Sequence, residues 1–126
     1  MMPAKSDDED DSMKFLLLNY VDYAERSKVS QEENGRLYAA YQAYLEALTK
    51  AGVLLSNHGL RPTSEAVTVR MRGGQQTVVN GPFAETKEQL GGYFLIEVDD
   101  IDAALAWAAR CPGAEYGAME VRPVWQ

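Results

Sequence analysis

The sequence is poor in the residues that most often mark redox and metal chemistry. It contains one cysteine, Cys111, and one histidine, His58. A single cysteine cannot form an internal disulfide, and one histidine with one cysteine is too small a ligand set for a zinc site. The start of the sequence also lacks the basic, apolar and small-residue order of a secretory signal. We therefore expect no metal, no internal disulfide and a reducing, cytoplasmic environment.

Long apolar runs and clusters of basic residues are absent as well. Apolar runs such as FLLL at residues 15–18 are far shorter than the roughly 18 residues that would suggest a membrane span. The formal net charge is −7 and the isoelectric point is about 4.6, with no basic cluster to contact a phosphate backbone. The sequence therefore indicates a soluble protein that binds neither a membrane nor a nucleic acid.

The negative charge is concentrated at the N-terminus. Residues 1–12, MMPAKSDDEDDS, hold five carboxylates against one lysine and offer little apolar surface to offset the entropy of ordering. We expect a disordered acidic tail over these residues. The remaining residues, 13–126, fall within the usual size of one domain, and 46% of the chain is hydrophobic, which is enough for a single core.

Hydrophobic periodicity predicts two central strands and a long helix. Residues 14–21 and 92–98 carry apolar side chains on both alternating sets, as strands buried on both faces do. Ser30 and Glu33 form a capping box that starts a helix reaching about residue 50, and Gly52 can end it in a left-handed conformation. The predicted core face of this helix consists of Leu37, Tyr41, Tyr44, Leu45 and Leu48.

A hairpin and a short strand are expected after this helix. Apolar and polar side chains alternate within residues 67–80, on either side of Gly73-Gly74. This pair permits the positive φ angles of a tight turn. We expect a β-hairpin with one solvent-exposed face. Residues 53–60 predict a strand that breaks up from Ser56 onward.

The last third of the chain predicts a second helix and a final strand. Asp99 and Asp102 predict the cap of the helix, and Pro112-Gly113 predicts its end. Apolar and polar side chains alternate within residues 116–125, which predicts a final strand. The apolar stripe expected on the second helix is Ile101, Ala104, Leu105 and Ala108.

This order of elements predicts an α+β protein with a ferredoxin-like arrangement, two split β-α-β units around an antiparallel sheet. Two helices can cover only one face of such a sheet, whereas the apolar residues of both central strands lie on both faces. Burying an exposed apolar patch contributes roughly 25 cal/mol per Å², so a patch of several hundred Å² favours association. We expect a homodimer, a dimeric α/β barrel, with the two sheets packed face to face.

The second half of the sequence resembles a known family. The stretch NGPFAETKEQLGGYFLIEVDDIDAALAWAARCPGAEYGAMEVRPV, which begins at Asn80, resembles the signature of the YCII-related proteins of the DGPF type, a branch of the dimeric α/β-barrel superfamily. In element order the resemblance extends from Met13 to Trp125. It implies a ferredoxin-like protomer and a dimer of two sheets. Some YCII-like members resemble enzymes with a histidine–aspartate acid–base pair, including dehydrochlorinases, and DGPF-type proteins are often encoded near alternative sigma factors.

Two departures from this pattern bear on function. Asn80 stands where the family has the aspartate that gives the motif its name, and a carboxamide cannot accept a proton at neutral pH. The first predicted helix, residues 31–50, contains no histidine. The acid–base pair implied by the resemblance therefore cannot be carried over to this chain.

Five residues are candidates for a pocket between the sheet and the first helix: Tyr41, Tyr44, His58, Asn80 and Glu85. Tyrosine offers an apolar wall with a hydroxyl, although the same tyrosines would also suit the core. Histidine is the residue type best suited to proton transfer at neutral pH, yet a lone loop histidine is often structural. The residues from Asn80 to Glu85 indicate either a turn with a solvated charged run or the mouth of the pocket.

Two functions remain open on the sequence. The first is the binding of a small organic molecule, with cofactor-free acid–base chemistry of a lyase or dehydrochlorinase kind in which His58 is the base and Asn80 orients the substrate. No cofactor is expected, because the sequence lacks GxGxxG, GxxxxGK[ST] and HExxH motifs. The alternative is a non-catalytic regulatory or interaction module with a protein partner, linked to an alternative sigma factor. The acidic tail and the missing acid–base pair motivate that alternative.

Overall fold

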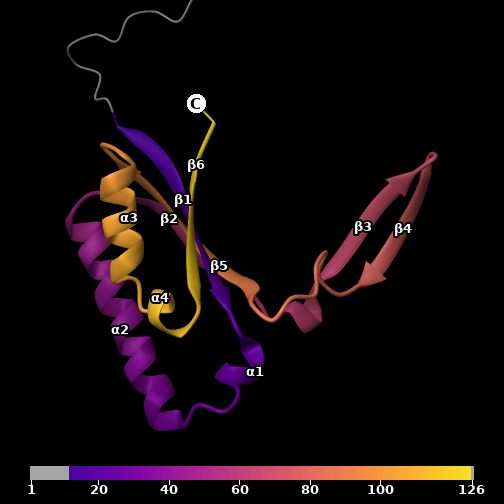
Figure 1. Cartoon of the computed structure of the whole chain (residues 1–126), viewed down its shortest axis with the longest axis horizontal. Coiled ribbons are helices and arrows are strands. Elements are labelled where there is room, and N and C mark those ends of the chain that lie inside the picture. The colour runs from indigo at the N-terminus through magenta and orange to yellow at the C-terminus, as the bar shows by residue number, and fades with distance from the viewer. Residues whose placement is uncertain (1–11, 126) are drawn as a thin grey trace, which may run out of the picture.

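The computed structural model describes residues 12–125, and the described chain is an α+β protein as expected. Strands β1 (Met13–Val21), β2 (Leu54–Gly59), β5 (Gln89–Val98) and β6 (Ala118–Pro123) form an antiparallel sheet in the order β2-β5-β1-β6. Figure 1 shows helices α2 (Gln31–Lys50), α3 (Ile101–Arg110) and α4 (Gly113–Tyr116) together on one side of this sheet. The ferredoxin-like prediction is confirmed.

The long helix α2 begins and ends where the sequence predicts. The Ser30 hydroxyl accepts a hydrogen bond of 3.1 Å from the backbone N–H of Glu33, and Gly52 has a φ of 73° just beyond the helix. Leu37, Tyr44 and Leu48 of α2 are buried. A polar cap at the N-terminus and a left-handed glycine beyond the C-terminus therefore fix the helix, and its leucines set the face that packs on the sheet.

The core lies between α2, α3 and one face of the sheet. Alternate residues of the two central strands face the helices, so Phe15, Leu17 and Ile96 are fully buried together with Leu48 of α2. On the opposite face Leu16, Tyr93 and Leu95 are only half-buried, because all three helices that pack on the sheet lie on the other side (Figure 1). This half-buried apolar surface is called the open face below.

Helix α3 differs from the prediction in its cap and in its buried stripe. The cap is Asp100, whose carboxylate accepts a hydrogen bond of 2.8 Å from the N–H of Ala103. Ala104 and Ala108 are buried as expected, whereas the predicted stripe members Ile101 and Leu105 are 42% and 49% exposed. Trp107 and Cys111 complete the buried side, so the packing stripe lies further round the helix than the sequence pattern indicated.

Strand β2 continues where a break was predicted. A register shift between Leu54 and Ser56 interrupts its pairing with β5, but Asn57 and His58 pair with Phe94 and Tyr93 and carry the strand to Gly59. A bulge of this kind bends a strand without ending it, which the sequence pattern at Ser56 could not distinguish from a break.

Short helical turns account for the other differences. Helix α1 (Tyr23–Arg26) and the 3₁₀ helix η1 (Thr63–Glu65) were not predicted, since one turn is too short to show a hydrophobic period. Helix α3 ends at Arg110, and Pro112-Gly113 begins the short helix α4 rather than a loop. Among the described residues, no helix combines the length and apolarity needed to cross a membrane. The predicted acidic tail lies outside the described residues, apart from Ser12.

The β3–β4 hairpin stands clear of the sheet (Figure 1). Strands β3 (Val67–Arg72) and β4 (Gln75–Asn80) pair through Arg72 and Gln75 around Gly73 and Gly74, whose φ angles are 56° and 77°. The predicted turn is confirmed. The prediction of a single solvent-exposed face is wrong, because no described element packs on the hairpin and its valines are more than half exposed on both faces.

Candidate functional site

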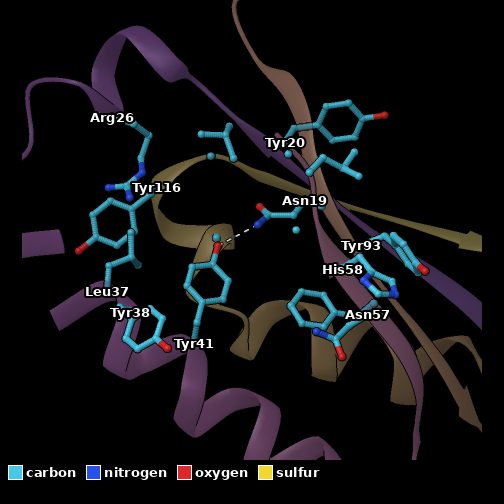
Figure 2. A pocket seen from close by; sticks show the side chains of 18 of the residues that line it. Asn19, Tyr20, Arg26, Leu37, Tyr38, Tyr41, Asn57, His58, Tyr93 and Tyr116 are labelled. Atoms are coloured by element: carbon cyan, nitrogen blue, oxygen red, sulfur yellow. Dashed lines mark hydrogen bonds between the residues drawn. The ribbon is translucent and has the colours of Figure 1, made fainter. Parts of the chain in front are cut away.

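A cavity of about 480 Å³ lies between α2 and the sheet (Figure 2). Helix α2 contributes its aromatic and apolar wall, and strands β1, β2 and β5 contribute the opposite wall. Helices α1 and α4 close one side. The lining residues used below are Asn19, Arg26, Leu37, Tyr38, Tyr41 and Tyr116.

Asn19 is the polar centre of the cavity wall. It lies on β1, on the same side of the strand as Phe15 and Leu17, and is only 8% exposed. Its Nδ2 donates a hydrogen bond of 2.8 Å to the hydroxyl of Tyr41, drawn as a dashed line in Figure 2. Its Oδ1 is buried and has no hydrogen-bond partner within residues 12–125. A buried carbonyl of this kind normally has a partner, so Asn19 holds an unused acceptor at the cavity wall.

Tyr41 is held as a neutral phenol beside Asn19. Burial raises the pKa of Tyr41, and the neighbouring Cys111 raises it further. The hydrogen bond from Asn19 and the positive charge of Arg26 act in the opposite direction and lower this pKa, but the net shift is upward. Tyr41 therefore remains protonated at neutral pH and carries no charge into the cavity.

Arg26 brings the positive charge of the cavity from helix α1. Asp22 starts this helix by accepting a hydrogen bond of 3.1 Å from the N–H of Glu25, and Arg26 lies at its end. The Nη1 atom of Arg26 is buried and has no hydrogen-bond partner within the described part of the chain. Figure 2 shows its guanidinium beside Tyr116, with the Tyr41 hydroxyl between it and Asn19.

Gly113 allows helix α4 to approach the Asn19–Tyr41 pair. A Cβ atom at Gly113 would lie 2.3 Å from Oδ1 of Asn19 and 2.7 Å from the hydroxyl of Tyr41. Because both distances are far below van der Waals contact, any side chain here would displace the pair. Gly92 similarly lets β5 lie against β2, since its Cβ would be 3.0 Å from the carbonyl oxygen of His58.

The structure divides the five predicted site residues among three places. Tyr41 and His58 line the cavity. Asn80 and Glu85 line a second hollow at the base of the hairpin, and Tyr23 lines both this hollow and the cavity. Tyr44 lies in the core, where its hydroxyl donates a hydrogen bond of 2.7 Å to the carbonyl of Trp107 and burial raises its pKa.

His58 reaches the cavity from the other side of the sheet edge. It pairs with Tyr93 across β2 and β5, and their ring centroids are 5.9 Å apart. Tyr93 belongs to the open face, whereas Asn57, one residue earlier on β2, pairs with Phe94 on the helix-covered face. Tyr41 and the imidazole of His58 therefore lie on opposite faces of the sheet. Within residues 12–125 no carboxylate pairs with His58.

Sequence reasoning did not identify Asn19 and Arg26. Asn19 had a usable signal, because it is the one amide in an otherwise apolar predicted strand, and a buried amide needs partners. Arg26 had none, since the helix that directs it into the cavity is a single turn. These two residues carry the polar chemistry of the cavity.

The fold and the cavity define a small ferredoxin-like α+β protein with a ligand-sized hollow beneath its longest helix. The YCII-related domain matches residues 13–126, and the chain belongs to this family, which confirms the resemblance in the sequence. The chain is similar to an uncharacterised protein of Rhizobium meliloti (strain 1021), with 39% identity over 114 residues that cover 89% of this chain and 92% of that protein.

Proposed function

We propose that this YCII-related protein binds a small organic molecule in the cavity between α2 and the sheet. The cavity volume of about 480 Å³ falls within the range of roughly 300–1,000 Å³ that is typical of small-molecule sites. The observation that carries the proposal is the unpartnered Oδ1 of Asn19, which is buried at a wall made mainly of aromatic and apolar side chains. A donor group on a bound molecule would satisfy this acceptor once Gly113 of α4, which packs against it, moves aside.

Acid–base chemistry is the narrower form of this proposal. Here His58 would act as the base of a cofactor-free proton transfer or elimination, on a molecule that extends past the edge of β2. Asn80 would not orient that molecule, because it lines the hollow at the hairpin base rather than the cavity. Binding of a small molecule in the cavity is therefore the primary proposal. Once a ligand is found, its conversion by the wild type and by a His58 variant tests the acid–base form.

The substitution Asn19→Leu tests the binding proposal. Leucine keeps the branched shape and leaves no unpaired acceptor, but it also removes the hydrogen bond to the hydroxyl of Tyr41, so urea denaturation is needed to show that the variant is folded. In a thermal-shift screen of small aromatic acids and phenols, a compound that binds should stabilise the wild type, by about 2.7 kcal/mol at a ligand concentration of about 100 Kd. We expect Asn19→Leu to lose this shift. Asn34→Leu, at an exposed position of α2 outside the cavity, is the matched control.

Retention of the full shift in Asn19→Leu would place the ligand elsewhere. The absence of any shift in the wild type, together with co-purification of a second protein, would favour the alternative function. The exposed hairpin supports that alternative, a regulatory or interaction module of the DGPF type, because it presents Val67, Val69 and Met71 to solvent, and Phe83 is exposed just after it. We assign the DGPF-type branch and the link to a sigma factor as part of this second proposal, on the Asn80-Gly81-Pro82-Phe83 motif.

We also propose that the protein is a homodimer whose sheets pack through their open faces. The half-buried Leu16 and Leu95 support this arrangement, since they pair with each other across β1 and β5 and lie on the face away from the helices.

A further inference from the structure

Arg26 differs from every other arginine of the described chain. Three arginines pair with glutamates (Arg36, Arg61 and Arg122), two stack over aromatic rings (Arg70 and Arg110), and Arg72 donates to a backbone carbonyl. Arg26 alone has a buried guanidinium nitrogen without a partner within residues 12–125. The guanidinium stays charged at any physiological pH, so Nη1, which is buried in a side chain that is otherwise only half-buried, is a charged donor without an acceptor in the described chain.

The cavity contains no acidic residue that could serve Arg26. None of its lining residues is an aspartate or a glutamate, although the protein carries a net charge of −7. The two acids of this segment are already engaged, because Glu25 pairs with Lys28 at 3.2 Å, and Asp22 caps α1 and lies 4.0 Å from Nζ of Lys87. Arg26 therefore gives an acidic protein a locally positive, partly apolar cavity.

We propose, on the basis of the binding function above, that the ligand of this cavity is a small organic carboxylate with a hydrogen-bond donor at some distance from its acid group. The carboxylate would pair with Arg26, whose planar fork matches a carboxylate in two parallel hydrogen bonds. The donor, a hydroxyl or an amine, would meet the unpartnered Oδ1 of Asn19. Leu37, Tyr38 and Tyr116 would enclose the apolar body between the two ends.

The arrangement of the two polar ends supports this class of ligand over others. Figure 2 shows Arg26 and Asn19 entering the cavity from different sides, with the Tyr41 hydroxyl between them. A single arginine matches a monoanion, whereas a phosphate dianion would leave one charge uncompensated in a cavity walled by tyrosine and leucine. A neutral molecule would leave the guanidinium unpaired.

Paired probes that differ only in charge test the inference. Calorimetric titration would compare 4-hydroxybenzoate and 4-hydroxyphenylacetate with their primary amides, and with inorganic phosphate. A charge-assisted hydrogen bond contributes about 1.5–3 kcal/mol, so we expect an acid to bind at least tenfold more tightly than its amide. Arg26→Gln should bind each acid no more tightly than its amide. Arg26→Lys should retain part of the difference in affinity between acid and amide.

The control is Arg61→Gln, which removes an exposed arginine paired with Glu65 and should leave the acid-to-amide ratio unchanged. Arg26→Gln should also unfold at an equal or higher urea concentration than the wild type, which shows that lost binding is not lost folding. Equal binding of acids and amides would overturn the carboxylate inference while leaving the binding function intact. Binding of phosphate alone would also overturn it. Failure of every probe, acid and amide alike, would count against both proposals.

Discussion

The four-stranded sheet and the β3–β4 hairpin both consist of antiparallel strands that carry apolar side chains, yet those side chains lie in opposite environments. Phe15, Leu17 and Ile96 of the sheet are fully buried, whereas Val67 and Val69 of the hairpin are 57% and 55% exposed. Both regions pair antiparallel, the sheet with register shifts at Asn19/Tyr20 and Leu54/Ser56 and the hairpin without one. The pattern of apolar residues therefore specifies an extended strand. The burial of its side chains depends on which other element packs against that strand.

The two regions should also differ in how they hold the fold together. A two-stranded hairpin is at best marginally stable alone, because its few contacts barely offset the loss of backbone entropy. The sheet gains from the packing of α2 and α3, whose core residues include Tyr44, Leu48 and Ala104. Stability should therefore reside in the sheet and its helices, and the hairpin should open locally without global unfolding.

Truncation in the two regions gives the largest expected difference. Ile96→Ala should reduce the free energy of unfolding by about 2–5 kcal/mol, because it leaves a cavity in the closed core. Val78→Ala in the hairpin removes a side chain that is 54% exposed, and its effect should stay within about 0.5 kcal/mol. Urea denaturation of both variants measures the difference. Equal losses would mean that the hairpin is buried in solution by something outside the described chain.

The proposed dimer sharpens the comparison, since either apolar surface could receive a second copy. Leu95→Glu places a charge on the open face, and we expect it to convert the dimer to a monomer in sedimentation at micromolar concentration. Val69→Glu places the same charge on the hairpin and should leave the dimer intact. Circular dichroism would establish that both variants are folded. The reverse result would assign the dimer contact to the hairpin, and a monomeric wild type would contradict the dimer altogether.

The fold could be predicted because its elements depend on local rules. The capping box at Ser30, the left-handed residue Gly52 and the Gly73-Gly74 turn each act over a few residues, and all are found as expected. The cap of α3 is Asp100 rather than Asp99, because the two neighbouring aspartates are equally suited to the role and the sequence pattern does not select between them.

The cavity could not be predicted, because it depends on short elements and long-range placement. Tyr41 and Tyr44 lie three residues apart on one helix, yet only the first reaches the cavity while the second packs against Phe94 in the core. Arg26 enters through the single turn of α1, and Gly113 allows α4 to close against Asn19. Asn80, which the family motif emphasised, lies at the base of the hairpin instead.

The smallest predicted effect concerns pH and again separates the two regions. Cys111 lies at the end of α3 with 2% exposure, and burial raises its pKa from 9.0 to about 11. The folded state therefore keeps the thiol proton in a range where the unfolded state releases it. The resulting stabilisation is complete below about pH 9 and is lost as the pH rises toward 11.

Urea denaturation of the wild type and Cys111→Ala between pH 8 and 10.5 measures this contribution. The wild type should lose on the order of 1 kcal/mol more than the variant by pH 10, because one ionisable group with a raised pKa has been removed. Part of the pH dependence should persist in Cys111→Ala, since burial also raises the pKa of Tyr41 and Tyr44. Val78→Ala should follow the wild-type pH dependence, because β3 and β4 contain neither cysteine nor tyrosine. Parallel curves for the wild type and Cys111→Ala would show that the thiol is not enclosed by the core.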